Sequence, residues 1–311
     1  MRALGLLVAI LAGVGLAGQG RVNGELGHRL GDGVAAAVVS FGSGLVLLAL
    51  AAAALPVGRR GLAALRAAWR TRGLRWWECA GGVVGGYFVA TQGLTVTALG
   101  LAVFTVAVVA GQVVSSLLVD RAGLGPGGPR PISAPRVAAA TLAVVAVVVA
   151  VADRAGSPRA LVLATLPAVA GIAVAWQQAM NGRVQARAGA LSAALLNFGV
   201  GTATLVACYA VVAAVRGVPA HWPAGWWLYT GGALGIVFVL AAVVVVRVTG
   251  VLMLGLGLIA GQVLGSLLLD AVAPARDAAP SGNEIVGALL TLVAVAVAAL
   301  PAGRRIVVPG G

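Results

Sequence analysis

Long apolar segments and short polar segments alternate along the whole chain. Each apolar segment holds about 20 residues, the length that a helix needs to cross a bilayer core about 30 Å thick. Their spacing predicts ten membrane-spanning helices, five in each half. We expect these helices at residues 3–20, 34–55, from 76, from 100, 137–152, 160–180, around 197, from 226, from 250 and at 285–300.

One stretch occurs twice. Residues 110–120 read AGQVVSSLLVD and residues 260–270 read AGQVLGSLLLD, with eight of eleven positions identical at a spacing of 150 residues. Apolar letters repeat by chance in a chain rich in Leu, Val, Ala and Gly, but a Gln and a closing Asp in register do not do so easily. The stretch therefore predicts two copies of one unit, residues 1–152 and 153–311. The repeated polar pairs are Gln112 with Gln262 and Asp120 with Asp270.

Shorter motifs support the same duplication. The first apolar segment alone is compatible with a signal peptide, but its copy at residues 160–180 lies in mid-chain, so we interpret both as helices. The two tryptophan pairs are typical of the aromatic belt at a membrane interface. The matched positions are Gln19 and Asn23 with Gln177 and Asn181, Ser40 with Asn197, and Trp76-Trp77 with Trp226-Trp227.

Five helices per unit is an odd number, so the second unit must enter the membrane in the opposite direction to the first. With the N-terminus inside, 15 arginines lie in inner segments and six in outer segments, as the positive-inside rule requires. Pro56 ends the second helix, and the polar loop that we expect between it and the third helix holds six arginines, whereas its counterpart holds only Arg216. The sequence predicts an all-α integral membrane protein of two inverted five-helix repeats, with both termini in the cytoplasm.

The composition agrees with this class and excludes others. The chain is 61% hydrophobic and 9% charged, with a mean hydropathy of +1.06, and a soluble domain needs more charge to cover its surface. The net charge of +13 accompanies no basic groove and no interleaved aromatics, so we expect no nucleic-acid binding. A chain without lysine has no phosphate-binding loop of the usual kind, and His28 and His221 lack metal-ligand spacing. We expect no enzyme activity, no cofactor and no metal.

The repeated motifs resemble those of the drug/metabolite transporter superfamily and, within it, the YdcZ-like inner-membrane exporters. They are QxxxN ending the first helix, [SN]FxxG in the second, WW…GG opening the third and AGQ…LLxD in the fourth, over nearly the whole chain. Many members of that branch look like one five-helix unit, and this chain looks like two units fused. The resemblance implies ten helices around a central cavity. The related small multidrug exporters rely on a glutamate in the first helix, which residues 3–20 lack, so proton coupling is not implied.

Uncharged polar residues inside the apolar segments are the candidates for a transport pathway. Opposite insertion places Gln112 and Gln262 at a similar depth near the middle of the membrane, where an amide must be hydrogen-bonded or hydrated. They either hold helices together or face each other across a cavity between the units. The other candidates are Gln19, Asn23, Ser40, Gln92, Gln177, Asn181 and Asn197.

These other candidates also have two interpretations. The Gln and Asn pairs at the ends of the first helices either line the two mouths of one pathway or cap helices before an Asn-Gly turn. Gln92, with Thr91 and Thr95 beside it, either gives a cavity its polar side or lies on a face whose threonines bond their own helix. Asp120 and Asp270 are interpreted as anchors at the membrane boundary or as partners of a nearby arginine.

The sequence as a whole favours a secondary transporter of the bacterial inner membrane that exports a small amphipathic metabolite or drug-like molecule by alternating access. Its partners are then a small-molecule substrate and the lipid bilayer, and both a monomer and a homodimer remain open. The alternative is a non-transporting membrane scaffold or lipid-interacting protein that assembles through its glycine-rich helix faces. A transporter predicts a polar-lined cavity between the units, and a scaffold predicts a filled apolar interior.

Overall fold

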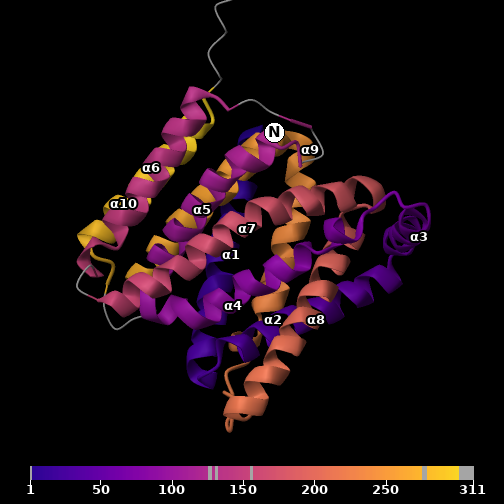
Figure 1. Cartoon of the computed structure of the whole chain (residues 1–311), viewed down its shortest axis with the longest axis horizontal. Helices are drawn as coiled ribbons and strands as arrows, with labels where there is room; N and C mark the ends of the chain where they lie inside the picture. Colours follow the sequence, from indigo (N-terminus) through magenta and orange to yellow (C-terminus); the bar gives the residue numbers. More distant parts are fainter. Residues whose placement is uncertain (1, 125–127, 130–131, 155–156, 275–278, 301–311) are drawn as a thin grey trace, which may run out of the picture.

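A computed structural model of the chain describes residues 2–124, 128–129, 132–154, 157–274 and 279–300, with backbone alone for 2–3 and 238–254. All regular elements of this part are helical (Figure 1). Seven of the described helices are long and apolar enough to cross a membrane, and α6 and α10 are shorter apolar helices. The elements are α1 Arg2–Leu30, α2 Gly33–Ala54, α3 Pro56–Arg70, η1 Trp76–Cys79, α4 Gly81–Leu99, α5 Leu101–Arg121, α6 Ala134–Ala150, η2 Ala152–Arg154, α7 Pro158–Ala188, α8 Ala190–Arg216, η3 Trp226–Tyr229, α9 Gly231–Val272 and α10 Gly282–Ala298.

The first helix of each half is longer than its apolar segment. We predicted ends at residues 20 and 180 and weighed an Asn-Gly turn there, which is wrong because α1 continues to Leu30 and α7 to Ala188. The glycine after Asn23 serves packing, since a Cβ on Gly24 would lie 2.7 Å from Val96 of α4. The turns come later, at Gly31 with φ 65° and Gly189 with φ 80°, and these are 158 residues apart, as Gln19 and Gln177 are.

The arginine-rich segment after α2 is a helix, where we predicted a polar loop. Pro56 ends α2 as expected, but it also begins α3, since proline is well suited to a first helical turn. One face of α3 packs against α7 and α8, because a Cβ on Gly61 would lie 2.2 Å from Ser192 Oγ. The opposite face exposes Arg59, Arg60, Arg66 and Arg70. The segment is therefore an amphipathic helix at one edge of the molecule (Figure 1).

The two helices predicted from residues 226 and 250 form the single element α9, whereas their counterparts α4 and α5 are separated at Gly100, with φ 86°. The two ends of α9 nevertheless lie along α1 in opposite senses. From Gly231 to Gly235 of α9, the contacted residue of α1 changes from Asn23 to Gln19, so residue numbers on α1 fall. From Gly257 to Gly265 it changes from Ala9 to Val14, so residue numbers on α1 rise. The direction of α9 relative to α1 therefore reverses between Gly235 and Gly257.

The two halves interlock through backbone contacts made twice. We call α5 and the last part of α9 the AGQ helices, because they hold the repeated residues 110–120 and 260–270. The first helix of each half packs on the AGQ helix of the other half, so α1 lies on α9 and α7 lies on α5. A Cβ on Gly261 would lie 1.9 Å from the carbonyl oxygen of Ile10, and one on Gly111 would lie 2.2 Å from that of Ala168. Such helices approach each other as closely as their backbones permit, which only glycine allows at these positions.

Equivalent helices of the two halves run antiparallel where they meet. Phe41 lies at Gly201 and Gly44 lies at Phe198, so residue numbers rise along α2 as they fall along α8. At one edge of the molecule α6 and α10 lie side by side (Figure 1). The start of α10 lies at the end of α6, because Asn283 donates to Asp153 and Gly287 packs on Ala150. This antiparallel arrangement is the one that we expect of an inverted repeat.

We predict that Gly13→Ala lowers the free energy of unfolding by about 1–3 kcal/mol, because the added methyl group meets the backbone of α9. A Cβ on Gly13 would lie 2.2 Å from the carbonyl oxygen of Leu258. Gly18→Ala is the matched control, since nothing lies within 4 Å of a Cβ at Gly18 in the same helix. Thermal unfolding of both variants in detergent measures the difference, and equal melting temperatures would contradict the proposed packing.

Candidate functional site

Four of the predicted polar residues form a buried group, which we call the first amide cluster. It consists of Gln19 and Asn23 of α1, Ser40 of α2 and Gln92 of α4, each less than a tenth exposed. Asn23 Nδ2 donates to Gln92 Oε1 over 2.8 Å, so a residue predicted from the third helix joins residues of the first. Gln19 and Asn23 share a helix face because they are four residues apart.

Two glycines of α9 complete the first amide cluster. A Cβ on Gly231 would lie 2.2 Å from Asn23 Oδ1, and one on Gly235 would lie 2.9 Å from Gln19 Nε2. Any larger residue at either position would displace an amide. The cluster therefore lies at the contact between the two halves of the chain, which is where the binding sites of repeat-based transporters lie.

A second amide cluster repeats this arrangement with the halves exchanged. It consists of Gln177 and Asn181 of α7 and Asn197 of α8. Gln177 Nε2 and Asn181 Nδ2 both donate to Asn197 Oδ1, over 3.0 and 3.3 Å. The facing glycines are Gly81 and Gly85 of α4, whose Cβ atoms would each lie 2.7 Å from an amide atom of Asn181 and Gln177.

The two clusters differ in their hydrogen bonding. In the second cluster Asn197 Oδ1 accepts two hydrogen bonds. In the first, Asn23 Oδ1 and Ser40 Oγ are buried and have no hydrogen-bond partner within the described part of the chain. A buried oxygen gains free energy when a donor reaches it. The first cluster can therefore receive a donor group that the second does not need.

Two stacked phenylalanines fill the space between the clusters. The rings of Phe41 and Phe198 are 4.8 Å apart at an interplanar angle of 26°. The tip of the Phe41 ring lies 3.1 Å from the Cβ position of Gly85 in the second cluster. The tip of the Phe198 ring lies 3.6 Å from that of Gly235 in the first. Phe41 follows Ser40 of the first cluster in the sequence, but its ring reaches the second cluster. Phe198 follows Asn197 of the second cluster, but its ring reaches the first.

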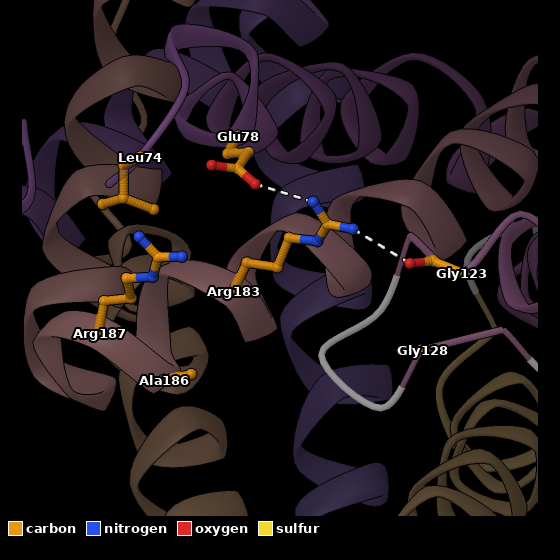
Figure 2. A pocket seen from close by; sticks show the side chains of 7 residues that line it. All are labelled: Leu74, Glu78, Gly123, Gly128, Arg183, Ala186 and Arg187. Carbon is orange, nitrogen blue, oxygen red and sulfur yellow. Dashed lines mark hydrogen bonds and ion pairs between the residues drawn. The ribbon is translucent and has the colours of Figure 1, made fainter. Parts of the chain in front are cut away.

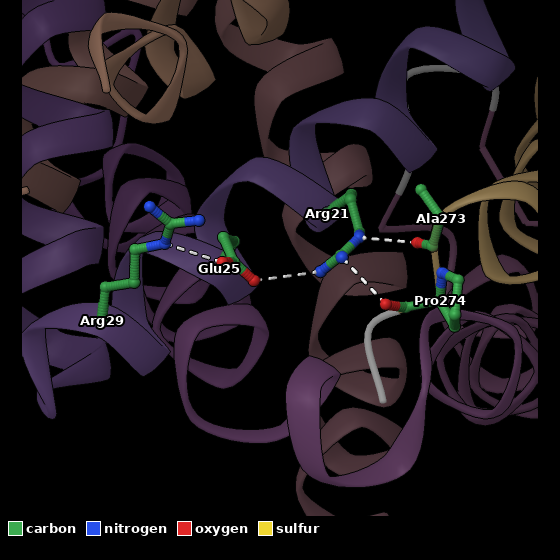
Figure 3. A network of polar contacts seen from close by, with 5 residues as sticks. All are labelled: Arg21, Glu25, Arg29, Ala273 and Pro274. Atoms are coloured by element: carbon green, nitrogen blue, oxygen red, sulfur yellow. Dashed lines mark hydrogen bonds and ion pairs between the residues drawn. The ribbon is translucent and has the colours of Figure 1, made fainter. Parts of the chain in front are cut away.

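An arginine fastens the end of each AGQ helix to the first helix of the other half. Arg21 of α1 donates to the carbonyl oxygens of Ala273 and Pro274 over 3.2 and 3.0 Å, and it pairs with Glu25 (Figure 3). Glu25 also pairs with Arg29 over 2.7 Å. We call this contact the Arg21 bridge.

The Arg183 bridge repeats that contact at the other end of the molecule. Arg183 of α7 donates to the carbonyl oxygen of Gly123 over 3.1 Å and to Glu78 over 2.9 Å (Figure 2). It also donates to the carbonyl oxygen of Leu124 over 2.6 Å. Gly123 and Leu124 stand 150 residues before Ala273 and Pro274. Comparison of the two halves of the sequence missed the pair because the two arginines are not at equivalent positions. The position equivalent to Arg183, 158 residues earlier, is Glu25 rather than Arg21.

Gln112 and Gln262 lie apart from the two clusters. Gln262 is buried where α9 packs on α1, and Gln112 is half-buried in α5. Neither lines the cavity of about 400 Å³ beside Arg183 or the cavity of about 300 Å³ beside Val114. No hydrogen bond of either side chain is recorded in the described part of the chain. Their role in a pathway stays a prediction.

The remaining candidates have structural contacts. Asp120 pairs with Arg136 over 2.6 Å, as one interpretation expected. Asp270 is buried and accepts a hydrogen bond over 2.7 Å from the backbone N–H of Ala102, at the start of α5. It thereby satisfies a backbone donor that the first turn of that helix leaves unpaired. Thr91 and Thr95 donate to carbonyl oxygens of their own helix, those of Phe88 and Thr91. Gln92 is therefore the residue of that face that makes a polar contact with another helix.

A protein-family model described as "Putative inner membrane exporter, YdcZ" matches residues 4–149 and again residues 162–297. The chain belongs to the YdcZ family. The double match is consistent with a two-repeat form, and with the apolar helices it makes this YdcZ protein a multi-pass membrane transporter of the inner membrane.

The comparison with solved structures gives the same fold. One of them, titled "Crystal structure of protein", is 23% identical to this YdcZ chain and superposes with a TM-score of 0.59. The alignment covers 97% of this chain and 98% of the other. The search of curated proteins found no match.

We predict that Arg183→Gln destabilises the protein by roughly 1–3 kcal/mol, because it leaves the mostly buried Glu78 carboxylate without its cation. Adding Glu78→Gln to Arg183→Gln should recover part of the loss, since the unpaired charge is then removed. Arg66→Gln, on the exposed face of α3, is the control because no hydrogen bond or ion pair of Arg66 is found within the described part of the chain. Melting temperatures in detergent test the series. A loss that Glu78→Gln does not relieve would show that the bridge to the carbonyl oxygens dominates.

Proposed function

We propose that this YdcZ protein exports a small hydrogen-bonding molecule by alternating access, and that the molecule passes between the two amide clusters. One observation carries the proposal: two polar clusters, one buried and one partly buried, each built by both halves, lie on either side of the Phe41–Phe198 stack. The expected pathway residues in the clusters are Gln19, Asn23, Ser40, Gln92, Gln177, Asn181 and Asn197, with Gln112 and Gln262 kept as further candidates.

We further propose that residues 1–152 and 153–311 are inverted units with ten crossings in all. The antiparallel contacts of α2 with α8 and of α6 with α10 support this, and so does the reversal of direction within α9. Six arginines between α2 and α4 favour the cytoplasmic side for that segment. The first amide cluster then lies towards the outside, and the second towards the cytoplasm.

The chemistry of the clusters points to an uncharged or weakly charged substrate. The side chains are amides and one hydroxyl, with no carboxylate or guanidinium among them. Amides recognise hydrogen-bond donors and acceptors without the desolvation cost of a buried charge. The free acceptors Asn23 Oδ1 and Ser40 Oγ favour a substrate that carries N–H or O–H groups. The aromatic pair between the clusters adds an apolar surface, so an amphipathic molecule fits both.

We propose that the Arg21 bridge and the Arg183 bridge hold the outer and the inner end of the pathway closed. Both are closed in this structure, since Arg21 and Arg183 each bind two carbonyl oxygens. Opening one end requires the first helix of one half to separate from the AGQ helix of the other half. Interfaces packed through glycine favour such rigid movements, because no long side chains interlock. Alternating access then opens one bridge while the other stays closed.

A non-transporting scaffold is the second candidate, and one observation favours it. Neither of the two cavities beside Arg183 and Val114 is lined by an amide of the two clusters. A scaffold leaves the clusters as permanent helix contacts, whereas a transporter exposes them in turn. The side from which the clusters react separates the two functions without knowledge of the substrate.

We predict that the phenylalanine pair separates the two sides of the pathway. In a background in which Cys79 and Cys208 are replaced by alanine, Asn181→Cys should react with a membrane-impermeant thiol reagent from the cytoplasmic side alone. Adding Phe41→Ala and Phe198→Ala should make it reactive from outside as well. Labelling of intact cells and of inverted vesicles measures the two sides.

Phe104→Ala is the matched control for this experiment. Phe104 is buried and its ring centre lies 5.9 Å from that of Phe88. It packs with Val96, Leu101 and Val108 and is not part of the Phe41–Phe198 pair. It should leave the labelling of Asn181→Cys one-sided. An Asn181→Cys protein that reacts from neither side, with or without the phenylalanines, would favour the scaffold. Equal leakage in the control would refute the role of the stack.

A further prediction separates pathway from packing at Gln112 and Gln262. Replacing a pathway residue by leucine should abolish ligand-induced stabilisation with little change in folded yield, while replacing a packing residue should lower the yield first. The probe is the compound that most stabilises the parent protein in a metabolite library. Reduced yield with unchanged ligand response in both variants would remove these residues from the pathway.

A further inference from the structure

A cavity beside the Arg183 bridge lies outside both amide clusters, at the end of α7. Its volume is about 400 Å³, and its lining residues come from the turn after α3, from η1 and from the last turns of α7, with Gly123 and Gly128 beyond the end of α5 (Figure 2). The lining residues are Leu74, Glu78, Gly123, Gly128, Arg183, Ala186 and Arg187.

Two of the three charged groups in this cavity are already bound. Glu78 accepts from Arg183 through Oε1 and from the backbone N–H of Arg75 through Oε2, over 2.9 and 2.8 Å. Arg183 uses its remaining nitrogens on two carbonyl oxygens. These two charges therefore cancel locally, and the cavity keeps one positive charge, that of Arg187.

Arg187 has no hydrogen bond or ion pair recorded with any described residue. Its guanidinium points towards Leu74 and the space in front of Arg183 (Figure 2). It lies close to the turn after α3, because a Cβ on Gly73 would be 2.7 Å from Arg187 Nη1. That turn holds Arg72 with φ 54°, a backbone conformation that non-glycine residues rarely adopt. The turn therefore shapes one wall of the cavity beside the Arg187 guanidinium, whose positive charge also acts on Glu78.

The surroundings of the cavity are those of a membrane interface. The guanidinium groups of Arg75 and Arg183 both lie near the ring of Trp77, at 5.9 and 5.7 Å from its centre. Trp76 next to it is 80% exposed, and the exposed face of α3 carries four arginines. Tryptophan at this depth and arginine beside it are typical of the level at which lipid phosphates lie.

We propose that this cavity binds a phosphate-bearing anion, with Arg187 as the main ligand. The planar fork of a guanidinium matches two phosphate oxygens, and the cavity is larger than a single phosphate group needs. The phosphate belongs either to the headgroup of an anionic phospholipid or to a soluble phosphate ester. The site does not depend on the transport proposed for the amide clusters, because no residue is shared between them.

The test uses the purified full-length protein in detergent and measures its melting temperature with three additives. Phosphatidylglycerol, phosphatidylcholine and glycerol 3-phosphate are added separately to the parent protein and to Arg187→Gln. We expect phosphatidylglycerol or glycerol 3-phosphate to raise the melting temperature of the parent by at least about 2 °C, since only the folded protein binds. Arg187→Gln should lose this increment and keep the melting temperature measured without additive.

The additives and variants decide between outcomes. A shift with phosphatidylglycerol alone identifies the lipid headgroup as the source, and a shift with glycerol 3-phosphate identifies a soluble ester. Arg66→Gln is the matched control, since Arg66 lies on the exposed face of α3 and outside the cavity, and it should keep the full shift. Arg187→Lys keeps the charge without the fork and should weaken binding several-fold. No shift in the parent, an equal shift with phosphatidylcholine, or a shift that survives in Arg187→Gln would overturn the proposal.

Discussion

Close backbone contact between the first helix of each half and the AGQ helix of the other half is the interaction on which the rest of the structure depends. The contact is made through Gly13 and Gly261 on one side and Gly111 and Gly171 on the other. Apolar side chains give little net attraction between helices in lipid, so dispersion contacts and weak backbone contacts must hold the helices together. Neither half can make these contacts alone, because each supplies one helix of both interfaces.

The polar clusters follow from this interlocking. Asn23 and Asn181 face glycines of the other half, and each follows a glycine contact on its own helix, at Gly13 and Gly171, by about three turns. An amide at this depth costs several kcal/mol if it is left unpaired in lipid. The halves therefore bury their polar residues against each other, and Phe41 and Phe198 occupy the remaining space at the centre. Packing and the proposed pathway use the same surface.

Sequence reasoning identified the duplication and the cluster residues because polar letters stand out in apolar segments. Gln19 and Gln177 could be matched to each other from their constant spacing in the sequence alone. It could not find the long ends of α1 and α7, because Gly24 is a turn former by local preference and becomes a packing residue only when α4 lies against it. It missed the helical α3 because arginine content was interpreted as a loop. It also missed the arginine bridges, since Arg21 and Arg183 occupy different positions in the two units.

Opposite insertion of the two halves is the central claim, and labelling of equivalent segments from one side of the membrane tests it most directly. Ala63 in α3 follows the second helix of the first half, and Val218 follows the second helix of the other half, where it is 71% exposed. Each is replaced by cysteine in a chain without native cysteines and treated in intact cells with a membrane-impermeant thiol reagent. The account predicts that Val218→Cys is labelled and that Ala63→Cys is labelled only after lysis. Labelling of both positions from the same side would contradict it.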